Sequence, residues 1–107
     1  MKTIDRITRH AEVSEKALEQ YLTRRVKQLG GLCLKFTNNT ATGFPDRICM
    51  FPGGKMMWVE LKSRGEKPRA LQLVRIRQLA ELGVEVYVCD SRESIDRALD
   101  NGKGGVV

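Results

Sequence analysis

The segment from Gly43 to Lys62, with the sequence GFPDRICMFPGGKMMWVELK, constrains the fold of this 107-residue chain more than any other. Mostly apolar residues fill two short stretches, 47–51 and 56–62, and the tetrapeptide Pro52-Gly53-Gly54-Lys55 separates them. Glycine adopts positive φ at no steric cost, so the tetrapeptide predicts a tight turn between two antiparallel strands. The segment is therefore interpreted as a β-hairpin.

Three charged residues converge on this hairpin. Successive side chains of a strand point to opposite faces, so Glu60 and Lys62 share a face with Met56 and Trp58. Asp46 enters the hairpin at the start of the partner strand. An ordinary solvated sheet edge is the alternative interpretation, and the apolar neighbours on the same face argue against it. Buried or half-buried charges are costly unless they are paired or hold a metal, so the pattern indicates a functional site.

The rest of the chain predicts an α/β domain. A strand–helix–strand connection from Met56 to Asp90 predicts a parallel strand pair, and the earlier strands form an antiparallel meander. We expect a mixed sheet with helices on both faces, and Leu71, Val74, Leu79 and Leu82 as core positions of the second helix. In order, the sequence predicts a polar arm over 1–12, a helix capped by Ser14 and ended by Gly30, strands over 32–37, 47–51 and 56–62, a helix over 69–82, a strand over 84–89, a short helix over 92–99 and a frayed tail.

Length and composition predict one globular domain over residues 1–107, with its core at about 14–99. The hydrophobic content is 41% and the charged content is 30%. Apolar runs fall far short of the ~18 residues that span a bilayer, so no membrane association is expected. The N-terminal sequence MKTIDRITRH has no apolar segment typical of a secretory signal. We therefore expect a cytoplasmic protein, in the host cytoplasm if a phage encodes it.

The cysteines and the net charge bear on the kind of site and the kind of partner. Cys33, Cys49 and Cys89 form no CxxC pair and fall within apolar strands, so they are interpreted as small core residues. His10 has no partner at ligand spacing and is assigned no role. The formal net charge of +6 and the pI near 9.6 favour a polyanionic partner such as nucleic acid.

Two carboxylates on adjacent strands suit a divalent cation. Mg²⁺ and Mn²⁺ prefer oxygen ligands in octahedral geometry. Asp46 and Glu60 would supply carboxylates, and the carbonyl of Leu61 is a possible third ligand. Lys62 is then placed to orient or deprotonate an attacking water and to stabilise developing charge. Glu60 follows Asp46 at a distance of fourteen positions, which gives the pattern PD-(x)n-E-x-K.

This pattern resembles the active-site hairpin of the PD-(D/E)xK nuclease superfamily, and more narrowly the virus-type replication-repair nuclease (VRR-NUC) domain. The resemblance covers residues 14–99 and rests on GFPDR, PGG, VELKSRGEKP, the pair Leu71-Gln72 and LGVEVYVCDS. It implies a restriction-endonuclease-like core with the order α-β-β-β-α-β. It also implies a Mg²⁺- or Mn²⁺-dependent endonuclease, and small phage-type members resemble homodimeric Holliday-junction resolvases.

The resemblance also implies roles for individual residues. Asp46 and Glu60 match the metal ligands, and Lys62 matches the catalytic lysine. Gln72 matches a glutamine that follows the basic loop and would orient a water or a phosphate; a solvated helix residue is the alternative. The superfamily often adds a carboxylate from the first helix. Glu15 and Glu19 both qualify, and Glu19 is preferred because resolvase-like relatives place this residue eleven positions before the glycine that ends the helix.

Basic residues cluster around the hairpin and are expected to contact phosphates, although an ordinary solvated surface is the alternative. Three functions remain open at this point. The first is a metal-dependent endonuclease on branched DNA such as a four-way junction. The second is a non-catalytic module that binds structured DNA, and the third is a nuclease for flap DNA or RNA. The basic residues are Lys35, Arg47, Arg64, Lys67 and Arg69.

Overall fold

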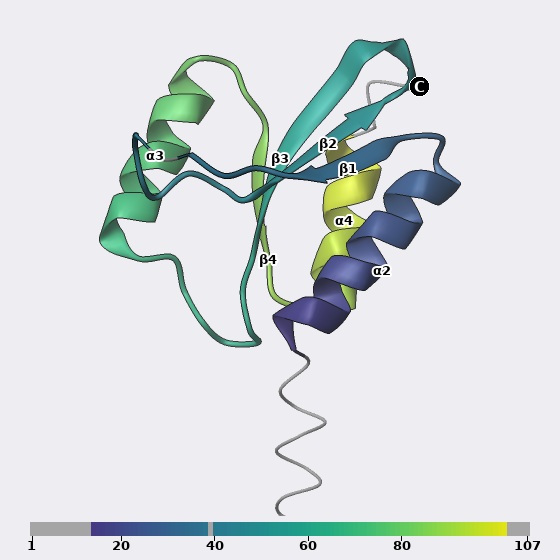
Figure 1. Cartoon of the computed structure of the whole chain (residues 1–107), viewed down its shortest axis with the longest axis horizontal. Helices are drawn as coiled ribbons and strands as arrows, with labels where there is room; N and C mark the ends of the chain where they lie inside the picture. Colours follow the sequence, from purple (N-terminus) through teal and green to yellow (C-terminus); the bar gives the residue numbers. More distant parts are fainter. Residues whose placement is uncertain (1–13, 39, 103–107) are drawn as a thin grey trace, which may run out of the picture.

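The computed structural model describes residues 14–38 and 40–102, and the arm, His10 and the last five residues lie outside this part of the chain. The order of elements confirms the predicted α-β-β-β-α-β-α arrangement (Figure 1). The elements are α2 (Glu15–Gln28), β1 (Leu32–Lys35), β2 (Arg47–Phe51), the 3₁₀ turn η1 (Pro52–Gly54), β3 (Lys55–Leu61), α3 (Ala70–Glu81), β4 (Val86–Cys89) and α4 (Arg92–Gly102).

The four strands form one mixed sheet in the order β1-β2-β3-β4. Strands β1, β2 and β3 are successively antiparallel, and β4 lies parallel to β3, as the strand–helix–strand connection predicts. Phe51 pairs with Lys55 across the end of the hairpin. Gly53 and Gly54 turn the chain there with φ values of 86° and 80°, a region that favours glycine. The hairpin prediction is confirmed.

Helix α2 begins and ends where its capping residues place it. The Ser14 hydroxyl accepts a hydrogen bond from the Ala17 amide at 3.1 Å, which satisfies one of the unpaired donors of the first turn. Glu15 in that turn complements the helix dipole. At the other end, Gly30 adopts a φ of 81° just after the helix. The apolar stripe of α2 is thereby presented to the sheet.

Helices α2 and α4 cover one face of the sheet and enclose the core. Each fully buried Val, Leu, Ile, Phe or Met side chain stabilises the fold by about 1.5–3 kcal/mol through the hydrophobic effect. Alternate residues of β2 and β3 point toward the two helices, so this face is buried along β2 and, in β3, from Met57 to Leu61. The core side chains are Leu18, Leu22, Val26, Cys49, Phe51, Met57, Val59, Leu61, Cys89, Ile95, Ala98 and Leu99.

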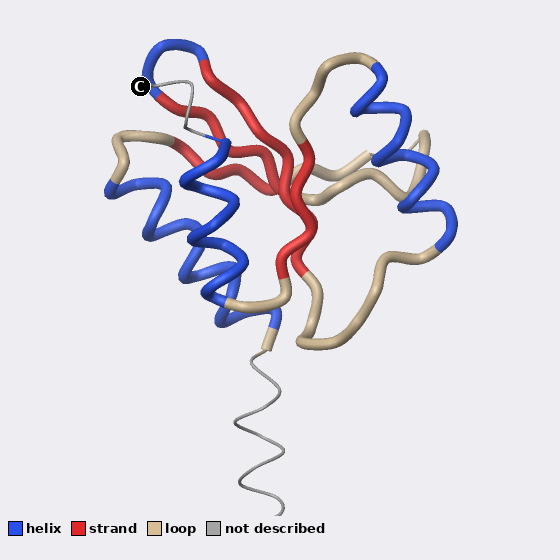
Figure 2. Tube along the Cα trace, turned by 180° about the vertical axis from the view of Figure 1, so that it is seen from behind, coloured by secondary structure: helices blue, strands red, loops and turns tan. Residues whose placement is uncertain are grey.

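Helix α3 stands on the far side of the sheet from α2 and α4 (Figure 2). Of its four predicted core residues, Leu71, Val74 and Leu82 are exposed and Leu79 is half-buried, so the prediction of a buried stripe is wrong. The physical reason is that α3 packs against the loop before β2 and has few contacts with the sheet. Arg75 donates a 3.0 Å hydrogen bond to a carbonyl of that loop and lies over the Phe44 ring at 5.0 Å.

The sheet face opposite α2 and α4 is largely open as a result. Leu32, Leu34, Met56 and Val88 come from three different strands and are between 39% and 55% exposed. None of the described helices is long and apolar enough to cross a bilayer.

Candidate active site

Glu60 and Lys62 lie on the open face of the sheet at the end of β3, and both are almost completely buried. The Lys62 Nζ atom lies 3.4 Å from Glu60 Oε2. The Lys62 backbone amide donates to the Cys89 carbonyl at 2.9 Å, which keeps the chain in the sheet beyond the last residue of β3. The two charges that the sequence places on one face are therefore a buried pair.

Gln72 joins this pair from the first turn of α3. Its Nε2 donates to Glu60 Oε2 at 2.9 Å, and its Oε1 accepts the Arg69 backbone amide at 2.8 Å. Gly43 allows the close approach of α3 to the loop that carries Asp46, because a Cβ at position 43 would lie 2.8 Å from Leu71 Cγ. The packing of α3 on the loop thus places Gln72 over the site.

The environment of Glu60 disfavours its negative charge. Burial is the main reason that the pKa of this carboxyl lies above its ordinary value, and the nearby charge of Asp46 raises it further. The Lys62 ammonium and the Gln72 amide act in the opposite direction without cancelling the shift. A carboxylate held in this way is stabilised by any additional cation.

Asp46 has one oxygen bound and one free. Its Oδ2 lies 2.9 Å from Arg47 Nη1. Its Oδ1 is buried, and it has no hydrogen-bond partner among residues 14–38 and 40–102. A buried acceptor without a partner costs about 1–3 kcal/mol, so a ligand is expected there. A carboxylate oxygen without a partner, next to a buried carboxylate of raised pKa, is the donor set that a hard divalent cation takes. The residues present therefore fit a divalent metal ion.

Leu61 contributes no side chain to this site, because its side chain lies in the core. Only its backbone carbonyl is available as a ligand. The described residues contain no group of three or more His, Cys, Asp or Glu side chains at ligand spacing. The candidate metal site thus consists of two carboxylates, a number of protein ligands typical of Mg²⁺ sites that keep several waters.

Arg47 is placed differently from the other basic residues. The sequence predicts that Arg47 contacts phosphate, but its side chain is buried, because residues 47, 49 and 51 of β2 point to the helix-covered face. It pairs there with Glu19 of α2 as well as with Asp46. This alternation was visible in the sequence and could have predicted the burial. Glu15, the other helix carboxylate considered, is exposed in the first turn.

The remaining basic residues are exposed. Arg64 and Lys67 lie in the loop between β3 and α3, and Arg69 caps α3. The loop is tied to the end of β4 by a 3.3 Å hydrogen bond from the Gly65 amide to Asp90. Lys35 lies opposite Arg47 in the β1–β2 register and is exposed. The structure therefore gathers three cations in the loop after Lys62 and places Lys35 on the outer strand.

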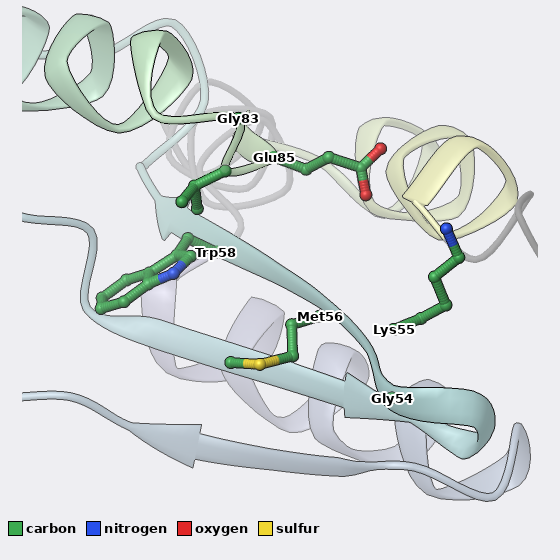
Figure 3. A pocket seen from close by; sticks show the side chains of 7 residues that line it. Gly54, Lys55, Met56, Trp58, Gly83 and Glu85 are labelled. Carbon is green, nitrogen blue, oxygen red and sulfur yellow. The ribbon is translucent and has the colours of Figure 1, made fainter.

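A hollow of about 320 Å³ lies at the opposite end of β3, between the hairpin and the turn after α3 (Figure 3). Trp58 lines this hollow and packs edge-on against Phe36, with ring centroids 4.8 Å apart. None of the three charged site residues Asp46, Glu60 and Lys62 lines it, so it is separate from the candidate active site. Its lining residues are Gly54, Lys55, Met56, Trp58, Gly83, Val84 and Glu85.

Comparison with known proteins shows the family of this chain. The family model of the VRR-NUC domain matches residues 3–93. The chain is 38% identical over 81 residues to a protein of Acyrthosiphon pisum secondary endosymbiont phage 1 described as "Putative nuclease p44", which covers 76% of this chain and 87% of the relative. A solved structure described as a VRR_NUC domain superposes with a TM-score of 0.77 at 29% identity, over 80% of this chain and 94% of the other. The chain belongs to the VRR-NUC family of nuclease domains.

Proposed function

We propose that this protein is a divalent-metal-dependent endonuclease that hydrolyses phosphodiester bonds in DNA. One observation carries the proposal: the free, buried oxygen of Asp46 lies near a Glu60 carboxylate whose pKa is raised, with the Lys62 ammonium in contact. Two neighbouring carboxylates that can hold a divalent cation, and a lysine beside them, are the parts that phosphodiester hydrolysis requires. The family membership supports the same chemistry.

Asp46, Glu60 and the Leu61 carbonyl would hold the Mg²⁺ or Mn²⁺ ion. When bound, such an ion neutralises phosphate charge and lowers the pKa of a water molecule. The other groups belong to the protein. Lys62 supplies a positive charge near the position of the scissile phosphate, where it orients the attacking water and stabilises charge that develops in the transition state. Gln72 fixes Glu60 Oε2, so the orientation of this carboxylate is set before substrate binds.

Recognition of DNA is assigned to the exposed cations. Arg64, Lys67 and Arg69 lie in the loop that follows Lys62, and contacts between such side chains and phosphates give affinity without base specificity. These side chains belong to a loop and a helix start and not to a helix face that could enter a groove. This placement supports recognition of DNA shape, with a four-way junction as the proposed substrate.

A homodimer is proposed because each chain supplies one site and resolution of a junction needs two cuts. The open sheet face supports this assembly, because exposed apolar patches of several hundred Å² mark interaction sites. A stable interface takes roughly 800 Å² from each partner, and the exposed side chains of Leu34, Met56 and Val88 spread over this face from β1 to β4. A two-fold dimer presents two equivalent sites to a branched substrate.

The test incubates the purified protein with labelled four-way junction, flap, single-stranded and linear duplex DNA, each with Mg²⁺, Mn²⁺ or EDTA. We expect paired, symmetric nicks on the junction with either metal, little cleavage of linear duplex and none in EDTA. Equal rates on junction and duplex, or a monomer by light scattering, would contradict the resolvase assignment alone. Binding of the junction without cleavage in either metal would favour a non-catalytic module. Cleavage of RNA alone would show that the substrate is RNA and not DNA.

A further inference from the structure

Arg47 is the one buried arginine among the described residues, and only 6% of its surface is exposed. A buried guanidinium is strongly destabilising unless charged partners and hydrogen bonds surround it. The position of Arg47 follows from the strand pattern, because its neighbours on the same face of β2 are the core residues Cys49 and Phe51. Its charge is therefore held inside the domain by the fold, and its partners show what the charge does there.

The guanidinium has two partners, which come from different elements. Nη1 contacts Asp46 twice, at 2.9 Å to the carboxylate Oδ2 and at 3.0 Å to the backbone carbonyl. Nη2 pairs with the Glu19 carboxylate of α2. Arginine presents several donors in one rigid plane, so a single side chain can fix both the carboxylate of Asp46 and the backbone that carries it. Glu19 in turn holds the guanidinium in place from the opposite side.

These contacts leave Asp46 with a defined orientation. Oδ2 is occupied by Arg47, and Oδ1 is the buried oxygen without a partner. Without Arg47, the carboxylate could rotate about its side-chain bonds, and the negative charges of Asp46 and Glu19 would have no cation between them. We propose that Arg47 is a positioning residue that fixes the Asp46 carboxylate for a divalent cation, and that Glu19 acts through Arg47 and not on the cation itself. This inference rests on the proposed function.

A phosphate contact is the competing role for Arg47, and the exposed surface argues against it. Only a few per cent of the Arg47 side chain is accessible, and both of its terminal nitrogens already have carboxylate partners. Arg64, in the loop after Lys62, is exposed by contrast. The two arginines therefore serve different partners, and substitution of each should affect a different measurement.

The experiment compares Arg47→Met and Arg47→Lys with Arg64→Ala and with Arg97→Met, an exposed arginine on α4. Calorimetric titration gives the Mn²⁺ affinity, and fluorescence anisotropy in EDTA gives the affinity for junction DNA. We expect both Arg47 variants to lose roughly 10- to 100-fold in Mn²⁺ affinity, the range typical of residues that orient a metal ligand, with DNA affinity in EDTA unchanged. Arg64→Ala should show the reverse pattern, and Arg97→Met should change neither affinity.

Circular dichroism and thermal melting establish which variants are folded. Arg47→Lys keeps a buried cation and preserves the test if the Met variant unfolds. Glu19→Gln should weaken Mn²⁺ binding less than Arg47→Met, and the double variant should bind as Arg47→Met does, because Glu19 acts only through the arginine. Unchanged Mn²⁺ affinity in folded Arg47 variants, or a loss of DNA affinity equal to that of Arg64→Ala, would overturn the proposal. A wild-type protein that binds Mn²⁺ and cuts no DNA would contradict the proposed function alone.

Discussion

The Gln72 side-chain amide donates a 2.9 Å hydrogen bond to Glu60 Oε2, the same oxygen that the Lys62 ammonium contacts. This bond connects α3, which has no residue in the core, to a buried carboxylate of the sheet. The position of α3 therefore bears on the candidate active site more than on the stability of the fold. That separation makes the roles of the site residues testable one by one.

Gln72→Ala should lower the cleavage rate by roughly 10- to 100-fold, because Glu60 loses the donor that orients it. The free energy of unfolding should change little, since Gln72 is only partly buried and packs outside the core. Single-turnover kinetics and thermal melting measure the two quantities. Gln78→Ala, a change of the same kind on an exposed residue of α3, is the matched control. Equal rates for the two variants would make Gln72 an ordinary surface residue.

Glu60→Gln should stabilise the metal-free protein at neutral pH. Burial and the Asp46 charge raise the pKa of Glu60 above its ordinary value of 4.5 in the folded state. The folded protein thus holds this proton more tightly than the unfolded chain, and stability falls as the pH rises through the window between the two pKa values. The substitution removes that loss. Thermal melting in EDTA should give equal melting temperatures near pH 4 and a higher value for the variant at pH 8. A lower melting temperature at pH 8 would contradict the assignment.

Lys62→Ala should lower the cleavage rate by about 100-fold or more while Mn²⁺ still binds, because the ammonium acts on the water and on the transition state. The variant leaves Glu60 without its nearest cation, so metal affinity should rise or stay unchanged. Calorimetric titration and single-turnover kinetics separate the two effects. Complete loss of Mn²⁺ binding in a folded Lys62→Ala protein would instead make the lysine a structural residue.

Cys33 should be the most reactive thiol of the protein. A hydrogen bond from the Cys49 thiol, with 3.8 Å between the sulfur atoms, lowers the pKa of Cys33 to about 7, whereas burial raises the pKa of Cys89 to about 11. Alkylation of Cys33 by iodoacetamide should reach half its maximal rate near pH 7, with Cys89 protected. Mass spectrometry of peptides reads out each site. Cys49→Ser should change the pH profile of Cys33, and equal labelling of Cys33 and Cys89 at pH 7 would contradict the placement.

Local patterns predicted the hairpin and the helix that precedes it. Both signals are local in the sequence. The PGG turn predicted the strand pair, and the alternation of side chains along the strand predicted the face on which Glu60 lies. The partner of α3 could not be predicted in the same way. An apolar stripe indicates that a helix face is covered, but it does not indicate which element covers it. We expected α3 to pack on the sheet, and it packs on the loop around Phe44.

The roles of Glu19 and Arg47 also depended on tertiary contacts. Glu15 and Glu19 both border the apolar side of α2, so helix periodicity does not distinguish them, whereas the contact of Glu19 with Arg47 does. Arg47 follows Asp46 directly, and the net positive charge of the protein suggested that this arginine contacts DNA. Its alternation with Cys49 was the better signal, because the inward face of a strand is set by periodicity whatever the charge of the residue.

The most direct test of a metal-dependent nuclease site is the cleavage of a four-way junction by wild type, Asp46→Asn and Glu60→Gln in Mn²⁺. Each substitution removes a proposed ligand with almost no change of volume, so the fold and the junction affinity in EDTA should persist. We predict cleavage by the wild type, no measurable cleavage by either variant, and loss of Mn²⁺ binding by calorimetry in both. Cleavage by either folded variant at the wild-type rate would contradict the assignment of these two carboxylates as the metal site.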